Sequence, residues 1–155
     1  MSKITVRKGK TEAVVVNRRA TEEKHFVYIA IANKKVAYLS GGKSKIVYIG
    51  NTKSGLSRVA TSMAKYTPNL FENLYGITSI KYYIIVPKKK NGFQGWEHLE
   101  RALISEFKFF YNEVPKGNTQ GKKFNMDRPL VKKSRSFFTE KTLYNIIDYY
   151  SNADI

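Results

Sequence analysis

The segments FVYIAIA (residues 26–32) and KIVYIG (residues 45–50) are the most β-prone parts of this chain, and they decide its fold. β-Branched and aromatic residues dominate both segments, as is typical of strands. Because side chains alternate along a strand, Tyr28 leaves the aliphatic face of the first segment, and Tyr48 leaves the face that Val47 occupies in the second. We therefore expect two strands whose tyrosines point into one cleft.

Further strands and helices surround this pair. β-Prone runs at 36–39 and 79–86 predict two more strands, with a turn at 33–35 before the first of them. A helical period appears over 54–66, and we expect Pro68 to end that helix. Its buried face is expected to consist of Leu56, Val59, Ala60 and Met63.

Two more helical signals follow toward the C-terminus. An apolar stripe through Trp96, Leu103 and Phe107 predicts a helix over 96–110. The period after Thr139, its expected N-cap, predicts a last helix. Between the two, residues 112–136 show no clear period and are expected to form a basic loop.

The chain of 155 residues is expected to be one domain over residues 1–155, because this length is close to the commonest domain size and 42% of the residues are hydrophobic. The expected fold class is α/β (α+β), a small, mostly antiparallel three-stranded central sheet flanked by helices. Within it we expect a core over about 26–113. An N-terminal hairpin is expected within 1–25, and a basic loop with a C-terminal helix over 114–155.

The charge of the chain points to a polyanionic partner. Its 28 Lys and Arg against 12 Asp and Glu give a formal net charge of +16, which favours nucleic acid ahead of an anionic membrane surface. The absence of cysteine excludes disulfides, cysteine-bearing zinc sites and thiol nucleophiles, and two histidines exclude a His-rich metal centre. No apolar run reaches the ~20 residues of a membrane span, so we expect a cytoplasmic protein with no membrane partner.

Glu100 is the most informative single residue. At about 100° per residue it projects within the apolar stripe of its helix, between Trp96 and Phe107. A carboxylate among aromatic side chains is unfavourable unless it is paired, protonated or bound to a metal. The alternative is a glutamate that reaches the helix edge and pairs with a lysine, and the residues by themselves leave both open.

Arg58 and the two tyrosines are weaker signals when each is taken alone. Arg58 lies opposite the apolar face of its helix, one turn before Ser62, where a basic residue is either solvated surface or a phosphate ligand. The chain has 11 tyrosines, so Tyr28 and Tyr48 are also explained as sheet residues with polar tips.

The order and spacing of these residues resemble the GIY-YIG nuclease family. Val27-Tyr28-Ile29 and Val47-Tyr48-Ile49-Gly50 are similar to its two tyrosine motifs, and Arg58 follows ten residues after the second tyrosine. Leu99-Glu100-Arg101-Ala102-Leu103-Ile104 resembles the family's glutamate helix, and Phe110-Tyr111-Asn112 resembles its closing aromatic-Asn element. The resemblance implies an endonuclease that hydrolyses phosphodiester bonds.

The chain also departs from the family pattern. The resemblance covers roughly residues 26–113, and its first motif reads Phe-Val-Tyr rather than Gly-Ile-Tyr. The two tyrosines lie 20 residues apart, farther than usual, because Val36 to Ser44 looks inserted. Ser62 stands where many members carry histidine.

The resemblance further implies a mechanism. Glu100 would hold one divalent cation, Mg²⁺ or Mn²⁺, and Arg58 would bind the non-bridging phosphate oxygens. Tyr28 would orient or deprotonate the attacking water, with support from Tyr48, and Asn112 would hold the glutamate helix against the active face. Possible auxiliary residues are Asn51, Lys53, Ser62 and Tyr66.

The partner implied is double-stranded DNA, bound by a monomer or a homodimer. The basic residues expected to contact its phosphates are Lys88, Lys89, Lys90, Lys116, Lys122, Lys123, Arg128, Lys132, Lys133 and Arg135. Such a chain suits a restriction enzyme or a phage or mobile-element endonuclease. The alternative is a non-catalytic, basic nucleic-acid-binding protein on the same fold, which explains the charge but not the position of Glu100 in an apolar stripe.

Overall fold

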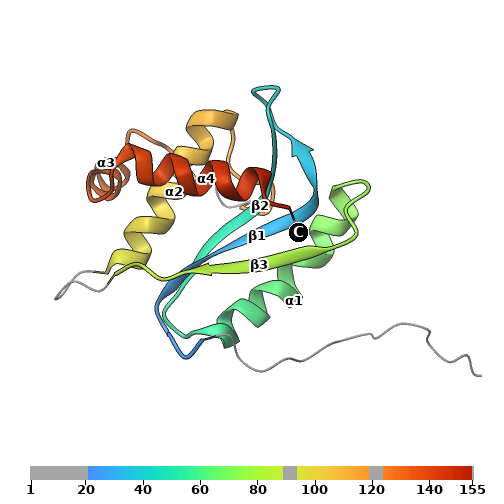
Figure 1. Ribbon diagram of the computed structural model, residues 1–155, viewed down its shortest axis with the longest axis horizontal. Coiled ribbons are helices and arrows are strands. Elements are labelled where there is room, and N and C mark those ends of the chain that lie inside the picture. Colours follow the sequence, from blue (N-terminus) through green and yellow to red (C-terminus); the bar gives the residue numbers. More distant parts are fainter. Residues whose placement is uncertain (1–20, 89–93, 119–123, 155) are drawn as a thin grey trace, which may run out of the picture.

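A computed structural model describes residues 21–88, 94–118 and 124–154. The hairpin expected near the N-terminus lies almost entirely outside the described residues, as do Lys89, Lys90, Lys122 and Lys123. In chain order the elements are β1 (Phe26–Ala37), β2 (Lys43–Thr52), α1 (Leu56–Asn73), β3 (Ile80–Ile85), α2 (Gly95–Tyr111), α3 (Pro129–Ser136) and α4 (Glu140–Asn152) (Figure 1).

The three strands form one antiparallel sheet in the order β2-β1-β3, which confirms the expected fold class. β1 and β2 are the two legs of a long hairpin whose tip projects beyond the sheet (Figure 1). The prediction of a separate strand at 36–39 is wrong, because β1 continues through the polar residues 33–35 and Val36 pairs with Ser44. The segment that looked inserted is therefore the outer part of this hairpin.

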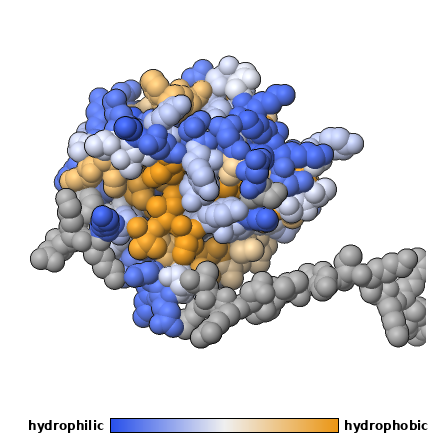
Figure 2. Space-filling view, in the orientation of Figure 1, coloured by the Kyte–Doolittle hydropathy of each residue, from blue (hydrophilic) through white to orange (hydrophobic). Residues whose placement is uncertain are grey.

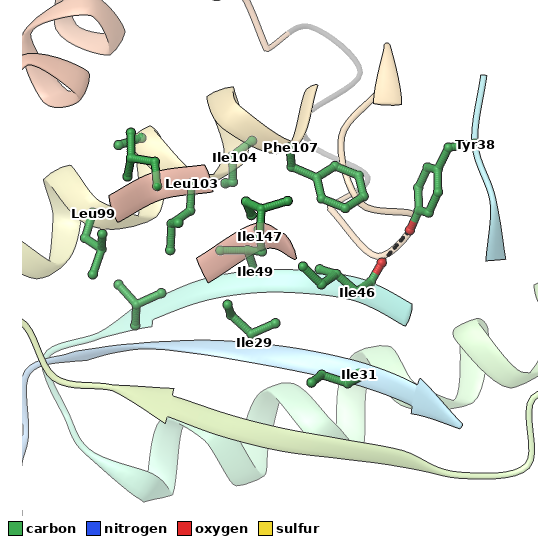
Figure 3. Close-up of a cluster of buried hydrophobic side chains, with 13 residues drawn as sticks. Ile29, Ile31, Tyr38, Ile46, Ile49, Leu99, Leu103, Ile104, Phe107 and Ile147 are labelled. Carbon is green, nitrogen blue, oxygen red and sulfur yellow. Dashed lines mark hydrogen bonds between the residues drawn. The ribbon is translucent and has the colours of Figure 1, made fainter. Parts of the chain in front are cut away.

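Helices cover both faces of the sheet. On one face, Ile29 and Ile31 of β1 pack with Leu103 and Phe107 of α2 and with Ile147 of α4 (Figure 3). On the other face, α1 packs against the sheet, and its Val59 lies in a buried cluster with residues of β1. The alternation expected for β1 is confirmed, because its aliphatic and aromatic side chains belong to these two separate clusters.

A β-bulge at Val47 changes the expected pattern of β2. Ala30 pairs with Tyr48, whereas the next residue, Ile31, pairs with Ile46, so Val47 is an extra residue in β2. Val47 packs in the cluster that contains Ala30 and, at its edge, Tyr48. The expectation that Val47 and Tyr48 occupy opposite faces is therefore wrong, because the bulge turns both toward α1.

Helix α1 differs from its expected extent and buried face. It continues through Pro68, which was expected to end it. Proline inside a helix lacks a hydrogen-bond donor and is unfavourable by about 3 kcal/mol, and burial of Leu70 two residues later offsets part of this. The buried residues of α1 include Ser62, whereas Ala60 and Met63, which were expected on the buried face, are exposed. The helix is rotated relative to expectation because Ser62 bonds to β1.

A short helix, α3, lies within the segment expected to be an irregular loop. Its inner face is docked on α2 by polar contacts: Arg135 Nη2 lies 2.6 Å from Glu106 Oε2, and Ser134 Oγ lies 2.9 Å from His98 Nδ1. Arg135 also donates to Ser105 Oγ at 3.3 Å. The apolar period that identifies longer helices is weak here, because Val131 is the only buried apolar side chain among the 8 residues of α3.

The C-terminal helix is confirmed as α4, and the Thr142 N–H donates to Thr139 Oγ1 at its N-terminus. In Figure 2, hydrophilic side chains surround a central hydrophobic area on the face shown. None of the helices within the described ranges has the length and apolarity to traverse a bilayer.

Candidate active site

Tyr28 and Tyr48 come together on the face of the sheet that α1 covers. Their rings stack with centroids 5.8 Å apart, and the ring of Tyr66 from α1 also stacks on Tyr48, at 5.7 Å. The Tyr28 hydroxyl hydrogen-bonds to Ser62 Oγ at 2.9 Å. The structure thus joins two of the expected catalytic residues to two of the expected auxiliary ones.

Tyr28 does not face an open cleft, as the sequence suggested. Its side chain is 1% exposed, because α1 closes over this part of β1, whereas Tyr48 remains partly exposed on the edge strand β2. Of the two tyrosines, Tyr48 is therefore the one that a substrate can reach.

The tyrosine rings also explain the glycine that ends the KIVYIG segment. A Cβ atom at Gly50 would lie 2.6 Å from Tyr48 Cε1 and 2.7 Å from Tyr28 Cζ. Such distances are well inside van der Waals contact, and neither ring is a flexible surface group. Gly50 is thus the residue that lets the two rings pack over the strand.

Replacing Gly50 with alanine should destabilise the protein by about 1–3 kcal/mol, as is usual when a well-packed interior is overfilled. Denaturant unfolding of the two proteins measures the difference. Gly41→Ala shows the opposite case: a Cβ there would meet no atom within 4 Å, so any loss of stability comes from its φ of +83°, a backbone strain that Gly50 does not share. Equal stability of Gly50→Ala and the unsubstituted protein would contradict this packing.

Glu100 reaches from α2 to the end of β2. Asn51 Nδ2 donates to Glu100 Oε2 at 2.5 Å. Burial raises the pKa of the Glu100 carboxyl, and the hydrogen bond from Asn51 and the charge of Arg101 act in the opposite direction. Within the described ranges, the carboxylate's partner is therefore an amide from the sheet rather than the lysine of the alternative interpretation.

Asn51 lies three residues after Tyr48 on β2, so the two side chains leave opposite faces of the sheet: Asn51 pairs with Val27 on the face that α2 covers, and Tyr48 pairs with Ala30 on the face that α1 covers. Burial raises the pKa of Tyr48 well above its ordinary value, and the neighbouring Tyr28 hydroxyl and the Glu100 charge raise it further. The Tyr48 phenol is therefore protonated at neutral pH and can donate a hydrogen bond.

Arg58 lies near the start of α1, which follows β2 almost directly. Gly55, with φ of 71°, makes the turn between the two elements, and Lys53 is exposed in the same connection. Arg58 is exposed as the third residue of α1. It takes part in none of the ion pairs among the residues that the structure describes, so its guanidinium is free to bind an anion.

Asn112 is not part of this group. It is the C-cap of α2, in the left-handed conformation with φ of 57°, and its N–H donates to the Lys108 carbonyl. Twelve residues of helix separate it from Glu100, about 18 Å at the usual rise. Its position accounts for the end of α2 and does not bring its side chain to the carboxylate.

Some of the basic residues expected to bind phosphate have intramolecular partners instead. Lys116 Nζ lies 2.6 Å from Glu113 Oε1 and sits over the Tyr38 ring, and Arg135 is paired with Glu106 as described above. The described residues of that set that remain exposed are Lys88, Arg128, Lys132 and Lys133, of which Lys132 lies 3.5 Å from an exposed Asp127 carboxylate.

Where the chain is described, it contains no cluster of three or more His, Asp or Glu side chains arranged for a metal ion. A divalent cation at this site would therefore depend on Glu100 and the Asn51 amide beside it. Sequence reasoning missed one residue next to the site, Asn118, whose side chain bonds to β2. No local sequence signal reveals such a contact, because it depends on the tertiary path after α2.

No family model, curated protein or solved structure matches this chain. The resemblance to GIY-YIG nucleases therefore stays a prediction, which rests on the residues and on their arrangement.

The hydrogen bond between Tyr28 and Ser62 gives a test of this arrangement. Tyr28→Phe should leave the buried Ser62 Oγ without its partner and destabilise the protein by about 1–3 kcal/mol. Ser62→Ala should act on the same bond, so the double variant should lose less stability than the sum of the two single variants. Denaturant unfolding of the four proteins measures the coupling. Strict additivity would show that the two hydroxyl groups do not interact.

Proposed function

We propose that this protein is a metal-dependent endonuclease that hydrolyses phosphodiester bonds in double-stranded DNA. The observation that carries the proposal is the half-buried Glu100 carboxylate, which accepts a hydrogen bond from Asn51, three residues along β2 from Tyr48. Arg58 lies in the first turn of α1, the helix that follows β2. We further propose that it acts in the cytoplasm as a restriction enzyme or a phage or mobile-element endonuclease.

The donors at Glu100 fit a hard divalent cation. Carboxylate and amide oxygens are ligand types that Mg²⁺ and Mn²⁺ accept in proteins. Because burial raises the pKa of Glu100, its charged form is incompletely compensated, which favours uptake of a cation. When bound, a single such ion would stabilise the negative charge that develops on the phosphate and on the leaving oxygen.

The protein's own side chains would bind and orient the scissile phosphate. The planar guanidinium of Arg58 offers a fork of N–H donors to two non-bridging oxygens. The protonated Tyr48 hydroxyl would donate a hydrogen bond to a phosphate oxygen or to the attacking water. Tyr28, buried and bonded to Ser62, would hold Tyr48 in place. The sequence-based expectation was different, because there Tyr28 orients or deprotonates the attacking water.

The decisive experiment is cleavage of a defined supercoiled plasmid. The protein with Mg²⁺ or Mn²⁺ should convert it to nicked or linear DNA, and a chelator should prevent this. The non-catalytic alternative, a basic nucleic-acid-binding protein, predicts a shifted but intact plasmid under the same conditions. Sequencing of the cut ends then identifies the role, because discrete sites indicate a restriction or mobile-element enzyme and scattered nicks a nonspecific nuclease.

The outward cations of α3 should contribute to DNA affinity. Each phosphate that a cation neutralises contributes about −0.9 to the slope of log K against log salt. Replacing both Lys132 and Lys133 with alanine should therefore flatten the slope by about 0.9 for each phosphate that is no longer neutralised. The measurement is a salt titration of binding, made with the Glu100→Gln protein in a metal that does not support cleavage.

Lys116→Ala is the matched control for this titration, because Lys116 is already paired with Glu113. It should leave the slope unchanged. If Lys116→Ala changes the salt slope and the substitution of Lys132 and Lys133 does not, the duplex does not contact α3.

A further inference from the structure

The segment of residues 115–118, which follows α2, closes the outer edge of β2. β2 is an edge strand, so some of its backbone groups have no strand partner. The Gly117 N–H donates to the Val47 carbonyl at 2.7 Å. The Asn118 side chain accepts from the Ile49 N–H at 2.9 Å and donates to the Ile49 carbonyl at 2.7 Å. One amide side chain thus satisfies both backbone groups of a strand residue.

These bonds fix the two residues on either side of Tyr48. Val47 is the bulged residue, where the ladder between β1 and β2 is interrupted, and its carbonyl is held by Gly117 instead. Gly117 also lies against Tyr48 itself, since a Cβ there would be 3.1 Å from Tyr48 Cδ2 and 2.8 Å from the Val47 carbonyl oxygen. The segment is therefore a lateral support for the one tyrosine of the stacked pair that is partly exposed.

We propose that Asn118 is a positioning residue for Tyr48. By bonding both backbone groups of Ile49, it holds the strand edge so that the Tyr48 phenol keeps its place between Tyr28 and Tyr66. The inference rests on the proposed nuclease function, in which Tyr48 contacts the phosphate or the water. A displaced phenol would bind DNA as before but stabilise the transition state less, because a small misplacement of a catalytic group is enough to slow the chemical step.

The test is Asn118→Ala, with steady-state cleavage of a plasmid or duplex oligonucleotide. We expect kcat to fall by about 10- to 100-fold, while KM for DNA changes by less than about twofold, since Asn118 is not a phosphate ligand. Asn33→Ala is the matched control. The Asn33 side chain likewise bonds to backbone groups, the N–H groups of Thr78 and Ser79, but it lies about 17 Å along β1 from Tyr28. It should leave kcat and KM unchanged.

Each outcome has a defined meaning. If the unsubstituted protein does not cleave DNA, both the proposed function and this inference are wrong. A protein that cleaves, and whose Asn118→Ala variant keeps its kcat or loses no more than Asn33→Ala, retains the proposed function but overturns the role of Asn118.

A second variant covers the case in which Asn118→Ala does not fold, as judged by circular dichroism. Gly117→Ala acts on the same support by pressing a methyl group against Tyr48 and the Val47 carbonyl. It should lower kcat with KM retained. A folded Gly117→Ala protein with unchanged kcat would overturn the inference.

Discussion

Replacing Glu100 with glutamine should abolish DNA cleavage and leave DNA binding intact. Glutamine has the same shape, and its carbonyl can still accept the hydrogen bond from Asn51, but it lacks the charge that a divalent cation requires. Stabilisation by a metal ion is worth several kcal/mol in the transition state, and each 1.36 kcal/mol is a factor of ten in rate. We therefore expect kcat to fall by about 10³-fold or more.

The Glu100→Gln experiment needs turnover in Mg²⁺ and binding to an uncleaved duplex, both measured on folded protein. Glu97→Gln is the matched control, since Glu97 lies on the same helix and its carboxylate pairs with Arg101 at 3.5 Å. The control should cleave normally. Near-normal turnover of Glu100→Gln would show that Glu100 is not the metal ligand.

Replacing Arg58 with alanine should lower kcat by about 10²- to 10³-fold, the loss typical of removing one donor to a developing anion. The folding stability should stay the same, because Arg58 is exposed and has no ion pair within the described part of the chain. Arg58→Lys should recover only part of the rate, since an ammonium group is a point charge and cannot bind two oxygens as a fork.

Lys81→Ala controls for the loss of one positive charge. Lys81 is exposed on β3 and is not among the residues placed in the site. Its removal should leave kcat unchanged. If Arg58→Ala unfolds the protein, or if the two alanine variants lose activity equally, the assignment of Arg58 to the scissile phosphate is wrong.

The sequence was sufficient for those features that depend on local periodicity. Alternation in β1 placed Tyr28 opposite its aliphatic neighbours. The prediction for β1 holds because the side chains of a strand alternate between its two faces. The helical period of α2 predicted Glu100 within the apolar stripe, whereas Glu100 is half-buried and the buried carboxylate of this helix is Glu106. The pairing of Glu100 with Asn51 needed the structure, since only the packing of α2 on the sheet brings the two together.

Other features could not be found in this way. The bulge at Val47 is a single extra residue, and no composition or spacing marks it. α3 has only 8 residues, docked partly through an ion pair, so its apolar period is weak. Asn118 reaches β2 through a turn after α2, and a polar residue in a turn looks the same whether or not its side chain bonds to a strand.

Because α3 packs on α2, some side chains of α3 can be substituted freely and others cannot. Removing Arg135 alone would leave the buried Glu106 carboxylate uncompensated, which is strongly unfavourable, so this pair should change only in concert. Arg128, Lys132 and Lys133 are exposed and carry no such constraint. Substitutions on the outward side of α3 can therefore alter the proposed affinity for DNA without disturbing the helix that carries Glu100.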